Sequence, residues 1–99
     1  MRPIHLALLD KHRPVVVLTR DTVRPYLTNV TVAPITTTIR GLSTELPVGP
    51  GNGLDQTSVV SLDNVQTIPV HDLGQRIGWL LPAQEHELTR AIAIAFDLA

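Results

Sequence analysis

The 99-residue sequence predicts one mainly β domain, a barrel or a sandwich, followed by a single C-terminal helix. Apolar residues make up 43% of the chain, and up to residue 80 they fall in short runs that alternate or are rich in β-branched residues. Beyond residue 82 they recur every four positions, which is a helical period. Because 99 residues suffice for one core and there are no cysteines to cross-link, we treat residues 1–99 as a single domain.

A tight hairpin is predicted near the N-terminus. Residues 4–8 alternate between apolar and other side chains, and residues 14–19 form a short run rich in valine. Only residues 10–12 and their neighbours separate the two segments, which is about the length of a tight turn. The two segments are therefore expected to pair.

The third predicted strand covers residues 28–36, which are rich in β-branched side chains. Pro34 lies inside it and cannot donate a ladder hydrogen bond, so this end of the strand is expected at a sheet edge or a bulge, open to a ligand. A loop over residues 37–43 follows.

Short strands separated by turns are predicted over the rest of the β region, at residues 44–48, 57–62, 65–69 and 76–80. The segment GPGNG after the first of them is expected to be a turn. It resembles a phosphate-binding loop only in its glycines, because no Lys-Ser/Thr pair follows and no helical pattern begins there.

The C-terminal helix is expected to begin at Pro82, because the first helical position needs no backbone donor. Leu88, Ile92 and Phe96 then share one face, which should pack on the strands. Leu81 stands where a capping Ser or Asp is common, a predicted loss of about 1 kcal/mol in local stability.

Composition excludes several functional classes. The formal net charge of -1 argues against broad electrostatic binding of nucleic acid, and no apolar run approaches the length of a membrane span. The four histidines show no metal-ligand spacing, and no G-x-S-x-G nucleophile motif is present. We therefore expect a cytoplasmic protein without a metal or another cofactor.

Three blocks of the sequence carry a resemblance: HRPVVVLT at 12–19, NVTVAPIT at 29–36 and SVVSLDNVQTI at 58–68. In order and spacing they resemble the MazF/PemK toxins of type II toxin–antitoxin systems, and residues 79–98 resemble the family's last strand and helix. The resemblance implies a MazF/CcdB-like fold, an SH3-like, partly open β-barrel. It also implies a homodimer that cleaves single-stranded RNA without a metal, as an mRNA interferase, and a MazE-like antitoxin partner whose acidic C-terminal segment covers the active groove.

By position, the resemblance implies that Arg13 and Thr36 are catalytic. The 2′-hydroxyl of RNA is an internal nucleophile, so the protein need only align it with the phosphorus and stabilise charge on the phosphate. The arginine fork would grip phosphate oxygens and help to move protons, with His12 as a candidate to assist. The products would carry a 2′,3′-cyclic phosphate and a 5′-hydroxyl.

Recognition of the RNA sequence is expected from the walls of the groove, where splayed bases are read through their edges. The candidate RNA-binding residues are Thr37, Thr38, Arg40, Asn52, Asp63, Asn64 and Gln66. Tyr26 is the aromatic residue best suited to stack on a base.

Two alternatives stay open on the sequence. The related CcdB group resembles this fold, yet its members inhibit DNA gyrase by binding, and a purely structural dimer with a degenerate groove ranks third. The presence of both Arg13 and Thr36 favours the nuclease over this non-enzymatic toxin.

Overall fold

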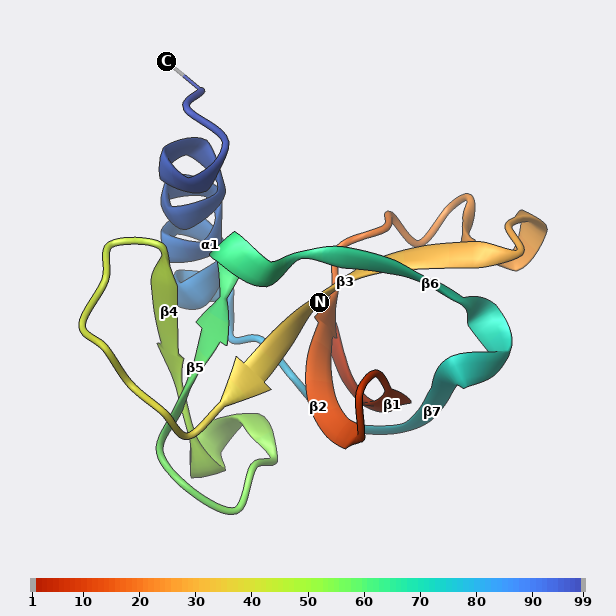
Figure 1. Cartoon of the computed structure of the whole chain (residues 1–99), viewed down its shortest axis with the longest axis horizontal. Helices are drawn as coiled ribbons and strands as arrows, with labels where there is room; N and C mark the ends of the chain where they lie inside the picture. The colour runs from red at the N-terminus through yellow and green to blue at the C-terminus, as the bar shows by residue number, and fades with distance from the viewer. Residues whose placement is uncertain (1, 99) are drawn as a thin grey trace.

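The computed structural model describes residues 2–98, which contain seven strands and one C-terminal α-helix (Figure 1). The strands are β1 (Pro3–Leu8), β2 (His12–Val17), β3 (Asn29–Thr36), β4 (Glu45–Val48), β5 (Ser58–Ser61), β6 (Gln66–Pro69) and β7 (Leu73–Trp79). The helix α1 is Pro82–Ala95, and short 3-10 turns are η1 (Arg24–Tyr26), η2 (Pro50–Asn52), η3 (Leu62–Asn64) and η4 (Val70–Asp72). The predicted fold class is confirmed.

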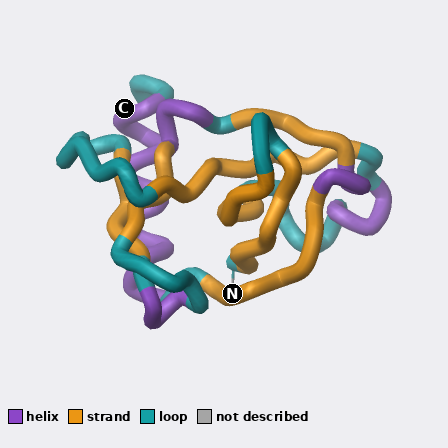
Figure 2. Tube along the Cα trace, turned by 60° about the horizontal axis from the view of Figure 1, so that its bottom comes forward, coloured by secondary structure: helices purple, strands orange, loops and turns teal. Residues whose placement is uncertain are grey.

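The strands form one strongly bent antiparallel sheet in the order β4-β5-β3-β2-β1-β7, with β6 also paired to β3. Figure 2 shows the strands curving around the molecule, with α1 along one side. Within residues 2–98 the two end strands, β4 and β7, are not paired with each other. The barrel is therefore partly open, as predicted.

The central strands β2 and β3 are buried on both faces. Side chains alternate along a strand, so Val16 joins one apolar cluster while Val15 and Val17 join another on the opposite face. All three valines are fully buried. This explains why residues 15–17 read as a continuous apolar run instead of an alternating one.

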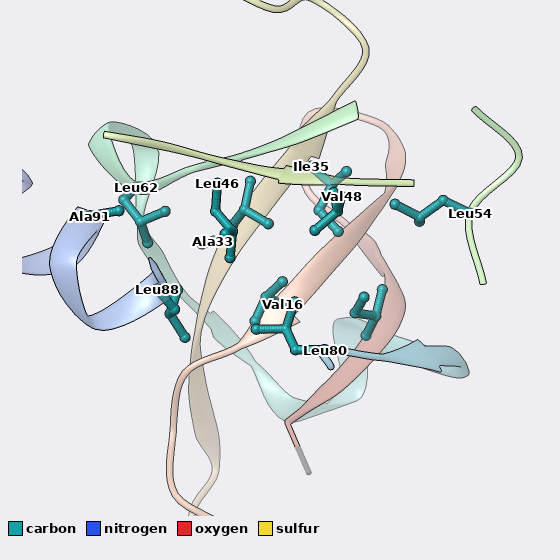
Figure 3. Close-up of a cluster of buried hydrophobic side chains, with 12 residues drawn as sticks. Val16, Ala33, Ile35, Leu46, Val48, Leu54, Leu62, Leu80, Leu88 and Ala91 are labelled. Carbon is teal, nitrogen blue, oxygen red and sulfur yellow. The ribbon is translucent and has the colours of Figure 1, made fainter. Parts of the chain in front are cut away.

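Helix α1 covers one end of the larger cluster. Leu88 and Ala91 of the helix belong to this cluster, and Figure 3 shows Ala91 beside Leu62. Phe96 does not continue this face: the helix ends at Ala95 and the Phe96 side chain is exposed, so that part of the prediction was wrong. No helix within residues 2–98 has the length and apolar character needed to cross a membrane.

The start of α1 is held by a glutamine in place of a capping residue. Leu81 contributes no side-chain cap, as expected, but its backbone N–H donates to Gln84 Oε1 at 2.8 Å. The Asn52 side-chain amide donates to the same oxygen at 2.6 Å. These contacts offset part of the loss predicted for Leu81.

Pro34 lies in the interior of the sheet, not at an edge or a bulge as predicted. It is buried and opposite Val15 of β2. On the other side of β3, β6 pairs with residues 29–32 and β5 with residues 35–36, so Pro34 falls where β3 changes neighbours. A residue without an N–H is tolerated at this position because the second ladder is interrupted there.

Candidate active site

A polar cavity of about 840 Å³ opens where β2 begins and β3 ends. Its walls come from the β1–β2 turn, the loop after β3, and η3 with the start of β6. The lining residues are Leu9, Asp10, Lys11, Arg13, Pro34, Ile35, Thr36, Thr37, Thr38, Arg40, Leu42, Glu45, Ser61, Asp63, Asn64 and Gln66. They include both predicted catalytic residues and all but one of the predicted RNA-binding residues.

Arg13 and Thr36 face each other across the β2–β3 pair. Val15 pairs with Pro34 and Val17 with Val32, and the same antiparallel register continued by two residues sets Arg13 opposite Thr36. Opposed residues of antiparallel strands lie on one face with Cβ atoms about 5 Å apart. The two side chains therefore enter one cavity from neighbouring strands.

The guanidinium of Arg13 is held by Asp10 from the β1–β2 turn. Nε donates to Oδ1 and Nη2 to Oδ2, each at 3.1 Å, so the pair is bidentate. Hydrogen bonding from Arg13 lowers the pKa of Asp10 below its ordinary value of 3.8, so this carboxylate is charged at neutral pH.

The hydroxyl of Thr36 is oriented by the backbone that follows it. The N–H of Thr38 donates to Thr36 Oγ1 at 3.1 Å. Because the oxygen accepts this hydrogen bond, the hydroxyl hydrogen remains available for another acceptor. Thr36 can therefore act as a hydrogen-bond donor within the cavity.

The loop after β3 is wrapped around the carboxylate of Glu45. The N–H of Arg40 donates to both of its oxygens, at 3.2 and 3.3 Å, and the N–H of Leu42 donates to Oε1 at 3.0 Å. Gly41 between them has a φ of 73°, a left-handed conformation that favours glycine. Glu45 thus fixes the wall that carries Thr37, Thr38 and Arg40.

The opposite wall is held by two short polar contacts. Thr44 Oγ1, at the end of the loop, donates to Asp63 Oδ2 at 2.6 Å, and within the wall itself Asn64 Nδ2 donates to Ser61 Oγ at 2.7 Å. Asp63, Asn64 and Gln66 are all exposed. Their remaining donors and acceptors can reach the edges of a bound base.

The cavity is lined by equal numbers of acidic and basic side chains, but they differ in whether they are already bound to another group of the protein. Three carboxylates and three cations line it. Asp10 and Asp63 already accept hydrogen bonds from side chains, and Glu45 from backbone N–H groups. Within residues 2–98, Lys11 and Arg40 form no ion pair. These two cations are available to an anionic ligand although the net charge of the chain is negative.

Asn52 lies outside the cavity, which corrects the prediction that it binds RNA. Its side chain is only 4% exposed and joins η2 to the start of α1. It donates to the Trp79 carbonyl and to Gln84, and accepts from the N–H of Gly49. Asn52 is therefore a structural residue whose amide is satisfied internally.

Two other candidates lie apart from the lining residues. His12 is exposed and, in the described chain, does not line the cavity, although Lys11 and Arg13 on either side of it do. Successive side chains of a strand point to opposite faces, so His12 faces away from the cavity that Arg13 enters. Tyr26 is 85% exposed on η1. Within residues 2–98, no group of three or more His, Asp or Glu side chains is placed to hold a metal ion.

Sequence reasoning missed three charged lining residues: Asp10, Lys11 and Glu45. For Asp10 a signal existed, since an acid three residues before Arg13 across a tight turn can reach it. For Glu45 the sequence contained no such signal. Its partners are backbone N–H groups of a loop, and every residue type except proline has one.

A family profile and one relative match nearly the whole chain. Residues 7–96 match the profile of the PemK-like, MazF-like toxins of type II toxin–antitoxin systems. The endoribonuclease MazF3 of Mycobacterium tuberculosis is 69% identical over 98 residues, which cover 99% of this chain and 95% of that protein.

Solved structures agree with the sequence match. The structure of the M. tuberculosis toxin MazF-mt6 aligns with a TM-score of 0.98 at 68% identity, covering 99% of both chains. A mycobacterial endoribonuclease in complex with its cognate antitoxin aligns with a TM-score of 0.87 at 24% identity, covering 98% of this chain and 93% of that one. At this identity, the second match supports the fold alone.

Proposed function

This chain belongs to the PemK-like, MazF-like toxin family of type II toxin–antitoxin systems, and from that premise we propose that it is an endoribonuclease cutting single-stranded RNA with Arg13 and Thr36. The observation that carries the proposal is the entry of these two side chains into one polar cavity from adjacent strands. The relative with 69% identity is itself named an endoribonuclease.

The proposed reaction uses the RNA as its own nucleophile. The 2′-oxygen attacks the neighbouring phosphorus in line, the bond to the 5′-oxygen breaks, and the 2′-proton is lost while the leaving oxygen gains one. The products are a 2′,3′-cyclic phosphate and a 5′-hydroxyl. Because no water molecule has to be activated as the nucleophile, the reaction does not require a metal.

Each catalytic side chain has a separate task. The guanidinium of Arg13 grips the non-bridging phosphate oxygens through charge-assisted hydrogen bonds and assists proton transfer at the reacting oxygens. Thr36 donates its hydroxyl hydrogen to the oxygen on which negative charge develops. The hydrogen bond from the Thr38 N–H leaves that hydrogen available, which supports this role.

Substrate choice is assigned to the two walls of the cavity. Thr37, Thr38 and Arg40 on one side, and Asp63, Asn64 and Gln66 on the other, offer mixed donors and acceptors to unpaired bases. A base-paired strand does not present these edges, so the cavity favours single-stranded RNA.

We further propose the biological setting. Residues 1–99 act as a single toxin domain that forms a homodimer in the cytoplasm. A MazE-like antitoxin inhibits it, with an acidic segment that competes with RNA for Lys11, Arg13 and Arg40. Lys11 and Arg40 line the cavity and form no ion pair within residues 2–98, which supports an acidic partner.

The test is cleavage of single-stranded RNA in excess EDTA, with both new ends mapped chemically. We expect cutting to persist, with 5′ ends that a kinase labels directly and 3′ ends that ligate only after the cyclic phosphate is removed. A 2′-deoxy substitution at the cut nucleotide should abolish cutting. Arg13→Ala and Thr36→Ala should lose activity, whereas Arg90→Ala, which removes an exposed arginine on α1, should retain it.

Cleavage that requires added metal, or that survives the 2′-deoxy substitution, would overturn the proposed chemistry. Intact RNA together with inhibited DNA supercoiling would instead support the gyrase-binding alternative left open by the sequence.

A further inference from the structure

We infer that Asp10 is a positioning residue, whose carboxylate fixes the Arg13 guanidinium so that its remaining N–H groups face the scissile phosphate. This inference rests on the proposed function, because it assigns the orientation of a residue that the proposal makes catalytic. Asp10 acts through Arg13 and makes no contact with the reacting atoms.

The pattern of contacts defines which edge of the guanidinium stays available. Asp10 accepts from Nε and from one hydrogen of Nη2, which is the side edge of the group. A guanidinium has five N–H donors. Within residues 2–98, the guanidinium of Arg13 donates two hydrogen bonds, both to Asp10. Both hydrogens of Nη1 and the second of Nη2 therefore remain, and one hydrogen of Nη1 together with that of Nη2 forms the end edge, which can bind two phosphate oxygens.

The location of the pair supports a role in orientation. Asp10 belongs to the tight turn between β1 and β2, where the Leu9 N–H donates to the Lys11 carbonyl at 3.0 Å. Arg13 lies near the start of β2, which is anchored in the core through its valines. A side chain with four rotatable bonds is thus held at its base by a buried strand and at its tip by a turn.

A contribution to stability does not explain the pair. The Asp10 side chain is 70% exposed and that of Arg13 is 25% exposed, and ion pairs this open to water contribute little to folding. The carboxylate also weakens the attraction of the cavity for RNA, because it places a negative charge beside the phosphate site. Asp10 therefore has opposite effects on the two kinetic parameters: it aids turnover and opposes binding.

The chain supplies a matched control in Asp21. This residue forms an ion pair with Arg24 three residues later, at 3.1 Å and with nearly the same exposure, 67% for Asp21 and 27% for Arg24. Neither residue lines the cavity in the described chain. Asp21→Asn removes a carboxylate of the same kind without touching Arg13.

The experiment measures kcat and KM for single-stranded RNA with Asp10→Asn and Asp21→Asn. For Asp10→Asn we expect kcat to fall by about 10- to 100-fold, the usual cost of a misplaced catalytic group, while KM stays the same or falls. Asp21→Asn should change neither. An unchanged kcat for Asp10→Asn overturns the inference, and so does a rise in KM, which indicates direct contact between Asp10 and RNA.

A double-mutant cycle separates positioning from an independent role. If Asp10 acts through Arg13, adding Asp10→Asn to Arg13→Ala should lower the residual kcat no further. An equal fall in both backgrounds means that Asp10 acts without Arg13, which overturns the inference.

The same data distinguish this inference from the proposed function. Full activity in Arg13→Ala defeats the assignment of Arg13 as catalytic. Loss of activity in Arg13→Ala together with unchanged kcat in Asp10→Asn defeats only the positioning role. The Arg13 Nε–H resonance gives a readout besides activity: we expect it to be sharp in the parent protein and exchange-broadened in Asp10→Asn.

Discussion

The backbone N–H of Thr38 donates a hydrogen bond of 3.1 Å to the hydroxyl oxygen of Thr36. This contact joins the end of β3 to the first residues of the loop that forms one wall of the cavity. It also uses the oxygen as an acceptor, which leaves the hydroxyl hydrogen for the substrate. The chemistry of Thr36 is therefore coupled to the conformation of the loop.

The first prediction concerns this hydroxyl. Thr36→Ser should retain most of the activity because it keeps a donor at the same position. Thr36→Val matches the shape of threonine without the hydroxyl and should lower the cleavage rate by about 10²- to 10³-fold. Single-turnover cleavage of one RNA by the three proteins checks this. Equal rates for the valine and serine variants would remove Thr36 from the mechanism.

A second prediction separates charge from shape at Arg13. Lysine keeps the positive charge but loses the planar fork that binds both Asp10 and two phosphate oxygens. Arg13→Lys should therefore bind RNA about as tightly as the parent protein but cleave it at least about tenfold more slowly. The measurement is RNA affinity beside the single-turnover rate. Parent-like cleavage by the lysine variant would contradict a role for the fork.

The third prediction tests the two cations that form no ion pair in the described part of the chain. Binding of single-stranded RNA should weaken with salt, and the log–log slope should lose about 0.7 for each phosphate contact removed. We expect that change in Lys11→Ala and in Arg40→Ala, whereas Arg90→Ala on the exposed surface of α1 should keep the parent slope. Titrations at several salt concentrations decide this. If neither variant altered the salt dependence of binding, the phosphates of the RNA would not contact Lys11 or Arg40.

A fourth prediction addresses the packing of η2 against β7. A Cβ atom at Gly78 would overlap the carbonyl oxygen of Asn52, whereas one at Gly41 would meet open space. Gly78→Ala should therefore lower the free energy of unfolding by about 3 kcal/mol. Gly41→Ala should lose only about 1 kcal/mol, the cost of its left-handed backbone. Urea unfolding of both variants is the measurement, and equal losses would contradict this difference in the space around the two glycines.

The fifth prediction is a pH dependence. Arg13 lowers the pKa of Asp10 in the folded protein, so the ion pair adds stability above the unfolded value of 3.8. That contribution is lost as the pH falls through the lower, folded pKa. Because the pair is open to water, the thermal midpoint of the parent protein should exceed that of Asp10→Asn by only a small margin at pH 6, and the two should converge once the pH falls below the lowered pKa of Asp10 in the folded protein. A constant difference down to the most acidic pH would show that the pair does not lower this pKa.

The sequence was sufficient for features that depend on local pattern. The valines at 15–17 and the β-branched run of residues 29–36 predicted strands, and Pro82 with Leu88 predicted the helix and its inner face. Family resemblance then selected Arg13 and Thr36, and both line one cavity. The predictions of the strands and the helix succeeded because strand and helix periods are properties of neighbouring residues.

Other features depended on contacts between distant segments. Pro34 was predicted at a sheet edge or a bulge, yet it lies in the interior of the sheet, where the pairing of β3 changes from β6 to β5. Asn52 was predicted to lie in the wall of the RNA groove, but its side-chain amide is fully engaged in hydrogen bonds with Gly49, Trp79 and Gln84. Neither outcome is encoded in the residues next to Pro34 or Asn52.

The sequence by itself determined the mainly β architecture, the terminal helix and the two residues offered for chemistry. Only the tertiary structure decided that Asp10 holds Arg13 and that Glu45 holds the loop around Arg40. The physical reason is that the spacing of apolar residues, which predicts strands and helices, can be read along the chain. The role of a polar side chain depends instead on the donors and acceptors that folding brings within hydrogen-bond distance.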